Sequence, residues 1–193
     1  MTTSYNKPSH PTPNTQHPIP TTPPMTYKQA LVKAAAYCAY QERTQQQVRE
    51  KASEWELDPD EIEAVVAEMV TQKFVDEARY ARSYVRGKYA ARRWGRRLLM
   101  QGLREQKLSD YCIRAGMSEI DPDVYWDNLL ALAAKKARAV LGESHPLKRK
   151  AKVLAYLASK GYESDLARDA AEQALRELGG ASALAADSED DDF

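Results

Sequence analysis

The sequence predicts an all-α protein of three tandem three-helix modules, which form an elongated, curved array of helix-turn-helix-like repeats. Three observations support this prediction. Apolar residues recur at helical spacing from about residue 27 to residue 178, and no segment shows the alternating pattern of a strand. Glycine is scarce, at 8 of 193 residues, while alanine, leucine, glutamate, arginine and lysine are plentiful. We expect about nine helices in all.

The first 25 residues are predicted to form a disordered tail. Seven of the ten prolines lie there, with small polar residues between them. Proline has no N–H to donate, and this segment holds too few apolar residues to build a core. It lacks the pattern of a secretory signal, and no run in the chain reaches the ~20 apolar residues of a membrane span. We therefore expect a cytoplasmic protein that does not contact a membrane.

Helix starts are marked by capping side chains that precede an apolar helical pattern. Such side chains accept hydrogen bonds from the first backbone N–H groups, and proline is favoured at the first helical position. The predicted starts are Thr44 before Gln45, Asp58-Pro59, Ser109, Asp121-Pro122, and either Ser144 or His145-Pro146. Gly161 suits a tight turn between two helices, and Gly179-Gly180 is expected to end the last helix.

The apolar pattern repeats three times, with copies 51 and 54 residues apart. Each copy is apolar at positions i, i+4, i+9 and i+14. The first two positions face the core from one helix, the third lies in a turn, and the fourth faces back from the next helix. Because one unit buries little core alone, we expect the modules to pack end to end. The copies are Val48, Ala52, Leu57, Ile62; Leu99, Leu103, Leu108, Ile113; and Val153, Leu157, Tyr162, Ala167.

We assign residues 26–75, 76–120 and 121–178 to the three modules and residues 179–193 to a disordered acidic tail. All five negative charges of this tail lie within the last seven residues of the chain. These five are Asp187, Glu189, Asp190, Asp191 and Asp192.

The zero net charge of the chain hides a strong segregation of charge. Residues 41–77 carry four basic and eleven acidic side chains, a net of −7. Residues 79–114 carry eleven basic and two acidic side chains, a net of +9, and residues 135–152 have a net of +6. The first module is therefore acidic, and the second and third modules are basic.

The bases of the second module concentrate on a helix expected from about Ala91 to Gln106. Its leucines fall on one stripe, and Arg93, Arg97 and Arg104 fall on another. Arginines one turn apart repel by roughly 0.2–0.5 kcal/mol, so a helix that carries them usually faces something acidic. One interpretation is a surface for a phosphate backbone or an acidic protein groove. The other is a solvated face that the acidic module neutralises.

We predict that the basic side chains of the second and third modules bind the partner. The predicted residues are Arg79, Arg82, Arg86, Lys88, Arg92, Arg93, Arg96, Arg97, Arg104, Lys107, Lys148, Arg149, Lys150 and Lys152.

Catalytic, metal and cofactor sites are not expected. His10, His17 and His145 lack the spacing of a metal site, and Cys38 and Cys112 lie on apolar stripes as small core residues. The chain has no glycine-rich phosphate loop and no nucleophile elbow. We therefore expect a protein that is not an enzyme and needs no cofactor.

The stretch from Phe74 to Val85, FVDEARYARSYV, resembles the signature of the RecX family of regulatory proteins. In that signature a hydrophobic pair and acidic residues precede Arg-aromatic-Ala, and Tyr-Val-Arg follows. The basic segment from Arg92 to Leu103 and the stretch from Asp58 to Val66 are similar to further elements of the family. The resemblance covers roughly residues 27–178.

The turns depart from the family pattern. The family usually has glycine followed by an apolar residue, which Gly161-Tyr162 keeps. Glu56-Leu57 and Lys107-Leu108 stand at the corresponding places in the first two modules, and Tyr89-Ala90-Ala91 replaces a usual Lys-Gly.

The resemblance implies a regulator of the bacterial recombinase RecA, active in recombinational DNA repair and the SOS response. Members of the family lodge in the groove of the RecA filament on single-stranded DNA. They limit its growth, ATP hydrolysis, strand exchange and stimulated cleavage of the SOS repressor. For this chain the resemblance implies a monomer that binds the RecA filament and single-stranded DNA, and duplex DNA weakly. The residues alone leave open a helix-turn-helix-like DNA-binding protein that acts without RecA, and a helical-repeat adaptor.

Overall fold

The computed structural model describes residues 25–187, with side chains up to residue 179. In this range the chain forms nine α-helices and no strand, so the predicted all-α class is confirmed. The helices are α1 (Tyr27–Tyr40), α2 (Gln45–Ser53), α3 (Pro59–Thr71), α4 (Glu77–Arg92), α5 (Arg96–Glu105), α6 (Asp110–Met117), α7 (Pro122–Ala139), α8 (Pro146–Ser159) and α9 (Ser164–Asp187).

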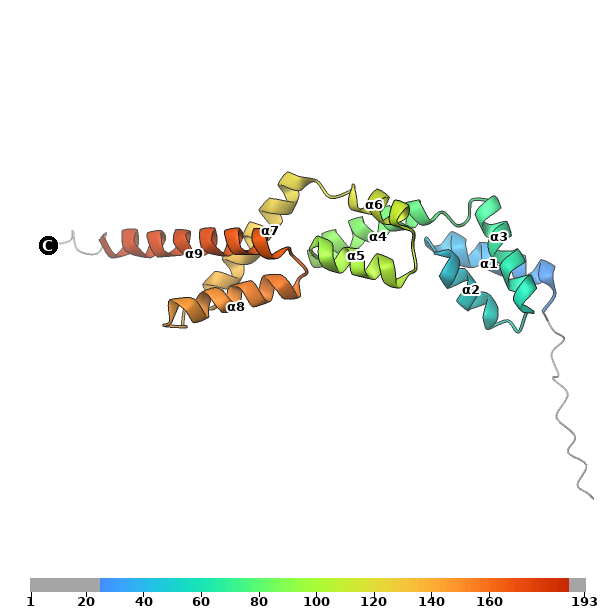
Figure 1. Ribbon diagram of the computed structural model, residues 1–193, viewed down its shortest axis with the longest axis horizontal. Helices are drawn as coiled ribbons and strands as arrows, with labels where there is room; N and C mark the ends of the chain where they lie inside the picture. The colour runs from blue at the N-terminus through green and yellow to red at the C-terminus, as the bar shows by residue number, and fades with distance from the viewer. Residues whose placement is uncertain (1–24, 188–193) are drawn as a thin grey trace, which may run out of the picture.

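The helices form three consecutive groups of three, which lie in a row (Figure 1). Each helix packs mainly against the two other helices of its own group. We call α1–α3 module 1, α4–α6 module 2 and α7–α9 module 3. The predicted tandem arrangement of three-helix modules is thus confirmed, and the molecule is elongated because the groups follow one another along a single axis.

Capping side chains start the helices where the sequence predicts. Thr44 Oγ1 accepts a hydrogen bond from the Gln47 N–H at 3.1 Å, and Ser109 Oγ accepts one from the Cys112 N–H at 3.4 Å. The Asp121 side chain caps α7, and prolines occupy the first positions of α3, α7 and α8. At α8 the capping position is His145, which decides between the two predicted starts.

The end of α9 differs from the prediction. The helix continues through Gly179 and Gly180 to Asp187, so the predicted stop at the glycine pair is wrong. The seven residues after the pair include four alanines and a leucine, which are the strongest helix formers, and they offset the roughly 1 kcal/mol that each glycine costs. The predicted acidic tail, residues 179–193, therefore begins too early, because residues 179–187 are helical. The rest of the two predicted disordered tails, residues 1–24 and 188–193, lies outside the described residues.

All twelve positions of the apolar repeat are buried, none being more than 8% exposed. The turn before the third repeat position also has one geometry in all three modules. Glu56, Lys107 and Gly161 each stand there with a left-handed backbone, at φ of 57°, 57° and 86°. A side chain is strained in this conformation, so the turn favours glycine, which only Gly161 supplies.

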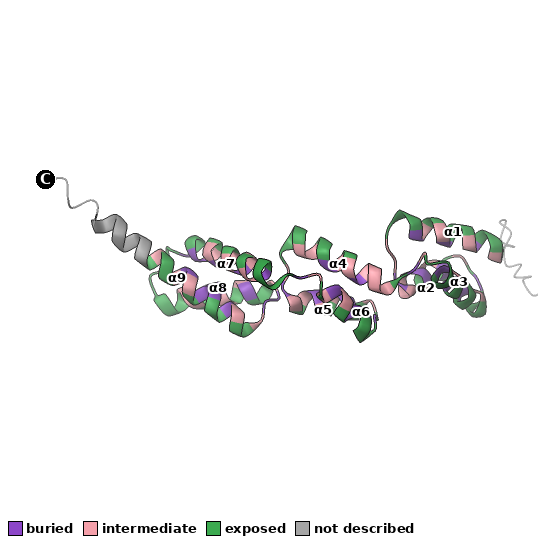
Figure 2. Cartoon of the chain, turned by 90° about the horizontal axis from the view of Figure 1, so that it is seen from above, coloured by how far each residue is buried: buried purple, intermediate pink, exposed green. Residues whose placement is uncertain are grey.

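The three modules contain two apolar cores rather than three. Module 1 encloses one cluster of buried residues, which includes Val48, Val65 and Met69. Modules 2 and 3 share a second, continuous cluster that runs from Ala81 to Ala174. In Figure 2 the buried segments face inward between the helices, and the outer sides of the helices are exposed.

Candidate partner-binding surface

Helices α4 and α5 meet at a sharp break, so the single helix predicted from Ala91 to Gln106 is wrong. Arg93 ends α4 in the left-handed conformation, with φ of 53° and ψ of 42°. Its N–H donates to the Tyr89 carbonyl at 3.0 Å, and Gly95 then caps α5. The break separates Arg93 from the arginine stripe of α5.

The neighbouring module fixes this break. The N–H of Gly95 donates to the Lys160 carbonyl at 2.8 Å, and the N–H of Arg97 donates to the Gly161 carbonyl at 3.1 Å. The two backbones come so close that a Cβ at Gly95 would overlap the Gly161 carbonyl group. The start of α5 is therefore fastened to the α8–α9 turn of module 3.

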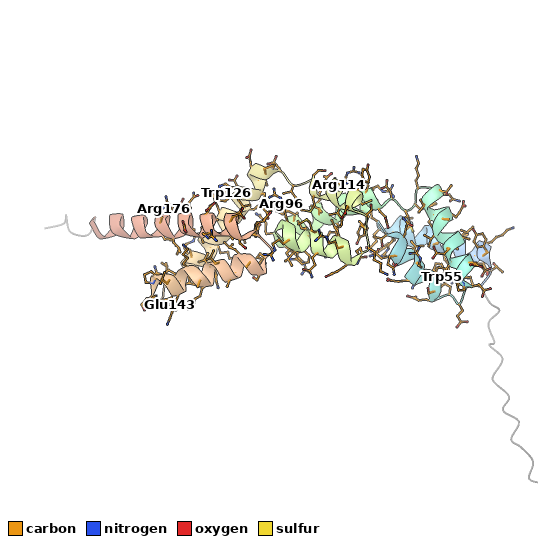
Figure 3. All side chains as sticks on the ribbon, viewed as in Figure 1. Trp55, Arg96, Arg114, Trp126, Glu143 and Arg176 are labelled. Atoms are coloured by element: carbon orange, nitrogen blue, oxygen red, sulfur yellow. The ribbon has the colours of Figure 1, made fainter. Side chains whose placement is uncertain are left out.

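Arg96 belongs to the same junction. Its guanidinium lies 4.1 Å from the centroid of the Tyr125 ring, and its Nη1 is 3.3 Å from Glu163 Oε1. The Tyr125 hydroxyl accepts from the Arg96 N–H at 3.1 Å and donates to Glu163 Oε2 at 2.6 Å. Burial, and then the hydrogen bond to Glu163, raise the pKa of Tyr125. Figure 3 places Arg96 where modules 2 and 3 meet, so this predicted binding residue joins the modules.

Three more predicted binding residues on α4 are engaged within the chain. Arg79 Nε donates to Glu42 Oε1 at 2.6 Å, which ties α4 to module 1. Arg82 and Arg86 share Glu119, at 3.7 Å and 3.0 Å. Each of the three is therefore at least partly neutralised before any partner arrives.

Most of the predicted bases of α8 are also paired. Arg149 donates to the Glu143 carbonyl from Nε and Nη2, at 3.1 Å and 2.8 Å. Lys150 pairs with Glu172 at 2.6 Å, and Lys152 pairs with Glu143 Oε2 at 2.8 Å. These contacts lower the pKa of both glutamates. Lys148 and Lys152 are the exposed members of the group, and no ion pair of the described residues involves Lys148.

We call the remaining predicted bases of module 2 the α4–α5 basic face. Within the part of the chain that the structure describes, none of them has an acidic partner within 4.0 Å. Five of them are exposed, and Lys88 is half-buried. The face consists of Lys88, Arg92, Arg93, Arg97, Arg104 and Lys107.

Two aromatic rings hold the α4 part of this face. Lys88 Nζ lies 5.5 Å from the ring centroid of Tyr84 and 5.5 Å from that of Trp94. The Arg92 guanidinium lies 5.8 Å from the centroid of Trp94. Cations are attracted to aromatic faces, so the rings restrict where these two charges can point.

The α5 part of the face surrounds a shallow hollow of about 640 Å³. Arg97 and Arg104 line it together with Met100, Gln101 and Glu105. Two of the three arginines predicted to share a stripe therefore do so, while Arg93 lies outside the helix.

The sequence did not reveal a second hollow, of about 460 Å³, along α4. Gln41 and Glu42 of module 1 line it at one end, and Lys88 and Arg92 of α4 line it as well. The residue of the sequence that could have indicated this hollow is Gly87, a glycine in the middle of a helix.

The described residues contain no group of three or more His, Cys, Asp or Glu side chains that could hold a metal ion. Within the same range, no helix is long and apolar enough to cross a membrane. Cys38 and Cys112 are buried, as expected for small core residues.

These features define a class of tandem three-helix-repeat proteins with an uncompensated basic face on the central repeat. Sequence models of the first, second and third three-helix domains of RecX match residues 30–69, 76–117 and 123–171. Together these matches cover more than half of the chain, and the chain belongs to the RecX family.

Curated relatives carry the name regulatory protein RecX. The protein from Bacillus mycoides is 27% identical over 139 residues, which cover 72% of this chain and 51% of that protein. The protein from Leuconostoc mesenteroides is 28% identical over 148 residues, 77% of this chain and 55% of that protein. The chain thus spans about half the length of these relatives.

Solved structures of the family share the fold. A crystal structure of a regulatory protein RecX aligns with a TM-score of 0.64 at 25% identity, over 72% of this chain and 70% of that one. RecX from Lactobacillus salivarius aligns with a TM-score of 0.70 at 21% identity, over 78% of this chain and 96% of that one.

Proposed function

We propose that this protein binds the RecA filament on single-stranded DNA and mainly inhibits its ATPase, strand exchange and coprotease activities. It would act in recombinational repair and the SOS response, as a cytoplasmic monomer. The observation that carries this proposal is the α4–α5 basic face in a chain of the RecX family. Its cations have no acidic partner among the described residues and are therefore available to a partner that carries negative charge.

The shape of the chain fits this role. Three modules in a row present their surfaces along one axis, as a partner with a long repeating groove requires (Figure 1). Guanidinium groups bind phosphates and carboxylates through paired hydrogen bonds, so exposed arginines suit both DNA and acidic protein surfaces. Lys148 extends the charge into module 3.

The test is RecA ATPase on single-stranded DNA with substoichiometric added protein. Arg97→Ala combined with Arg104→Ala removes two exposed charges from α5 and should raise the concentration needed for inhibition by roughly tenfold or more. Arg168→Ala combined with Arg176→Ala on α9 is the matched control, because both arginines are exposed and lie outside the face. Equal potency of the two double variants would refute the role of the face.

The same unpaired cations support a second candidate, a helix-turn-helix-like DNA-binding protein that acts without RecA. Cations that displace counterions from phosphates bind DNA without any other protein. This candidate requires salt-dependent binding of duplex DNA at full strength in the absence of RecA. Weak duplex binding together with strong inhibition of RecA favours the first candidate.

A further inference from the structure

Gly87 has no packing partner inside the protein that explains it. It lies in the interior of α4, and a Cβ built there would meet nothing within 4 Å among the described residues. Glycine in the middle of a helix lowers stability relative to alanine. The position gains nothing from internal packing in return, and its small size leaves room for a group that approaches from outside.

A shallow hollow lies over this glycine. Ser83, Gly87 and Ala91 line it at four-residue spacing, so one stripe of α4 exposes its backbone along about two turns. Module 1 closes one end of the hollow through Gln41 and Glu42. In Figure 2 the outer side of α4 is largely exposed, on the side away from α5 and α6.

The lining of the hollow is positive. Lys88 and Arg92 stand on its rim, held against the rings of Tyr84 and Trp94. The one acid that lines it, Glu42, already accepts a hydrogen bond from Arg79 at 2.6 Å. The hollow therefore suits an anionic group.

The hollow offers little to an apolar protein helix. Its large side chains, Tyr80 and Tyr84, are half-buried and stack on each other with ring centroids 6.1 Å apart. The exposed large hydrophobic residues of the described chain, such as Tyr40 and Val70, do not line it. Protein interfaces usually bury an apolar core, whereas nucleic-acid interfaces are polar and positively charged.

We propose that the sugar–phosphate backbone of a single DNA strand lies in this hollow. The strand passes close to α4 at Gly87, and Lys88 and Arg92 bind its phosphates. A single strand is named because the proposed partner is a filament on single-stranded DNA. The inference rests on the proposed function, because it names the DNA contact of the same surface.

The experiment uses the full chain and a fluorescent oligothymidine, by anisotropy at low salt and without recombinase. Gly87→Leu fills the hollow without changing charge, and it should weaken binding roughly tenfold or more while the melting curve stays the same or rises slightly. Ala90→Leu is the matched control. At about 100° per residue, Ala90 and Lys88 fall on opposite sides of Gly87, and Ala90 is exposed and does not line the hollow. Its binding should equal that of the unaltered chain.

Lys88→Gln supplies a second variant, which should lower the slope of log affinity against log salt by about one. Equal binding by Gly87→Leu and the unaltered chain would overturn the proposal, as would an equal loss in both leucine variants. If the unaltered chain fails to bind the oligomer but still inhibits RecA ATPase, this inference fails and the proposed function stands. If Gly87→Leu binds DNA normally but no longer inhibits RecA, the hollow receives protein instead.

Discussion

The turn with a left-handed backbone recurs in all three modules, so it can be tested by opposite substitutions. Removing the glycine in module 3 should lower stability, and introducing a glycine in module 1 should raise it. Gly161→Ala places a Cβ 2.6 Å from Leu98 Cγ and 2.8 Å from the Leu98 backbone nitrogen. A backbone neighbour cannot rotate away, so overpacking costs about 1–3 kcal/mol, and the φ of 86° adds about 1–2 kcal/mol of strain. We expect the free energy of unfolding of the shared core of modules 2 and 3 to fall by about 2–5 kcal/mol.

Glu56→Gly tests the reverse change in module 1. The substitution removes the strain of a side chain on a backbone with φ of 57°, but glycine also raises the conformational entropy of the unfolded chain. The net effect is a gain of roughly 0.5 kcal/mol. Urea unfolding followed by far-UV circular dichroism measures both variants. A Gly161→Ala protein as stable as the unaltered chain, or a Glu56→Gly protein that loses stability, would refute the common turn geometry.

The remaining predictions concern two buried tyrosines and the end of the chain. Tyr125→Phe should cost about 1–2 kcal/mol of unfolding free energy, because it leaves Glu163 Oε2 and the Arg96 N–H without their partner. Tyr162→Phe should be neutral or stabilising, because the Tyr162 hydroxyl is buried with no hydrogen-bond partner among the described residues. Urea titration compares the two variants. Burial raises the pKa of both tyrosines. Their contribution to the free energy of unfolding is therefore complete below the ordinary phenol pKa of about 10 and is lost as the pH rises above it. Stability should fall at alkaline pH, and it should fall less in the double phenylalanine variant. Removing residues 188–193, which include four acids, should tighten binding of single-stranded DNA at low salt if the tail competes for the basic face, and equal affinity would leave the tail only a role in solubility.

Local and periodic features were predictable from the sequence. Thr44 and Asp121 start helices because capping depends on a side chain and the next few N–H groups. The twelve repeat positions are buried because helical periodicity places them on one face. The charge segregation also identified the region that holds the α4–α5 basic face.

Features that depend on contacts between modules were not predictable. Nothing local distinguishes Arg96 from Arg97, yet the first joins modules 2 and 3 through Tyr125, and the second is exposed. The break at Arg93 follows from the approach of Gly95 to the α8–α9 turn, which lies about 65 residues away in the sequence. Pairing with Glu119 and Glu143 likewise removed several predicted bases from the candidate surface.

The division of the apolar cores sets how the chain loses its structure. Module 1 has its own core, and side-chain hydrogen bonds such as Arg79 with Glu42 and Gln47 with Gln106 join it to module 2. Modules 2 and 3 cannot separate without exposing a common core and breaking backbone hydrogen bonds at Gly95. The three sequence repeats therefore make two cooperative units, and amide hydrogens of α1–α3 should exchange through an opening that leaves α4–α9 protected.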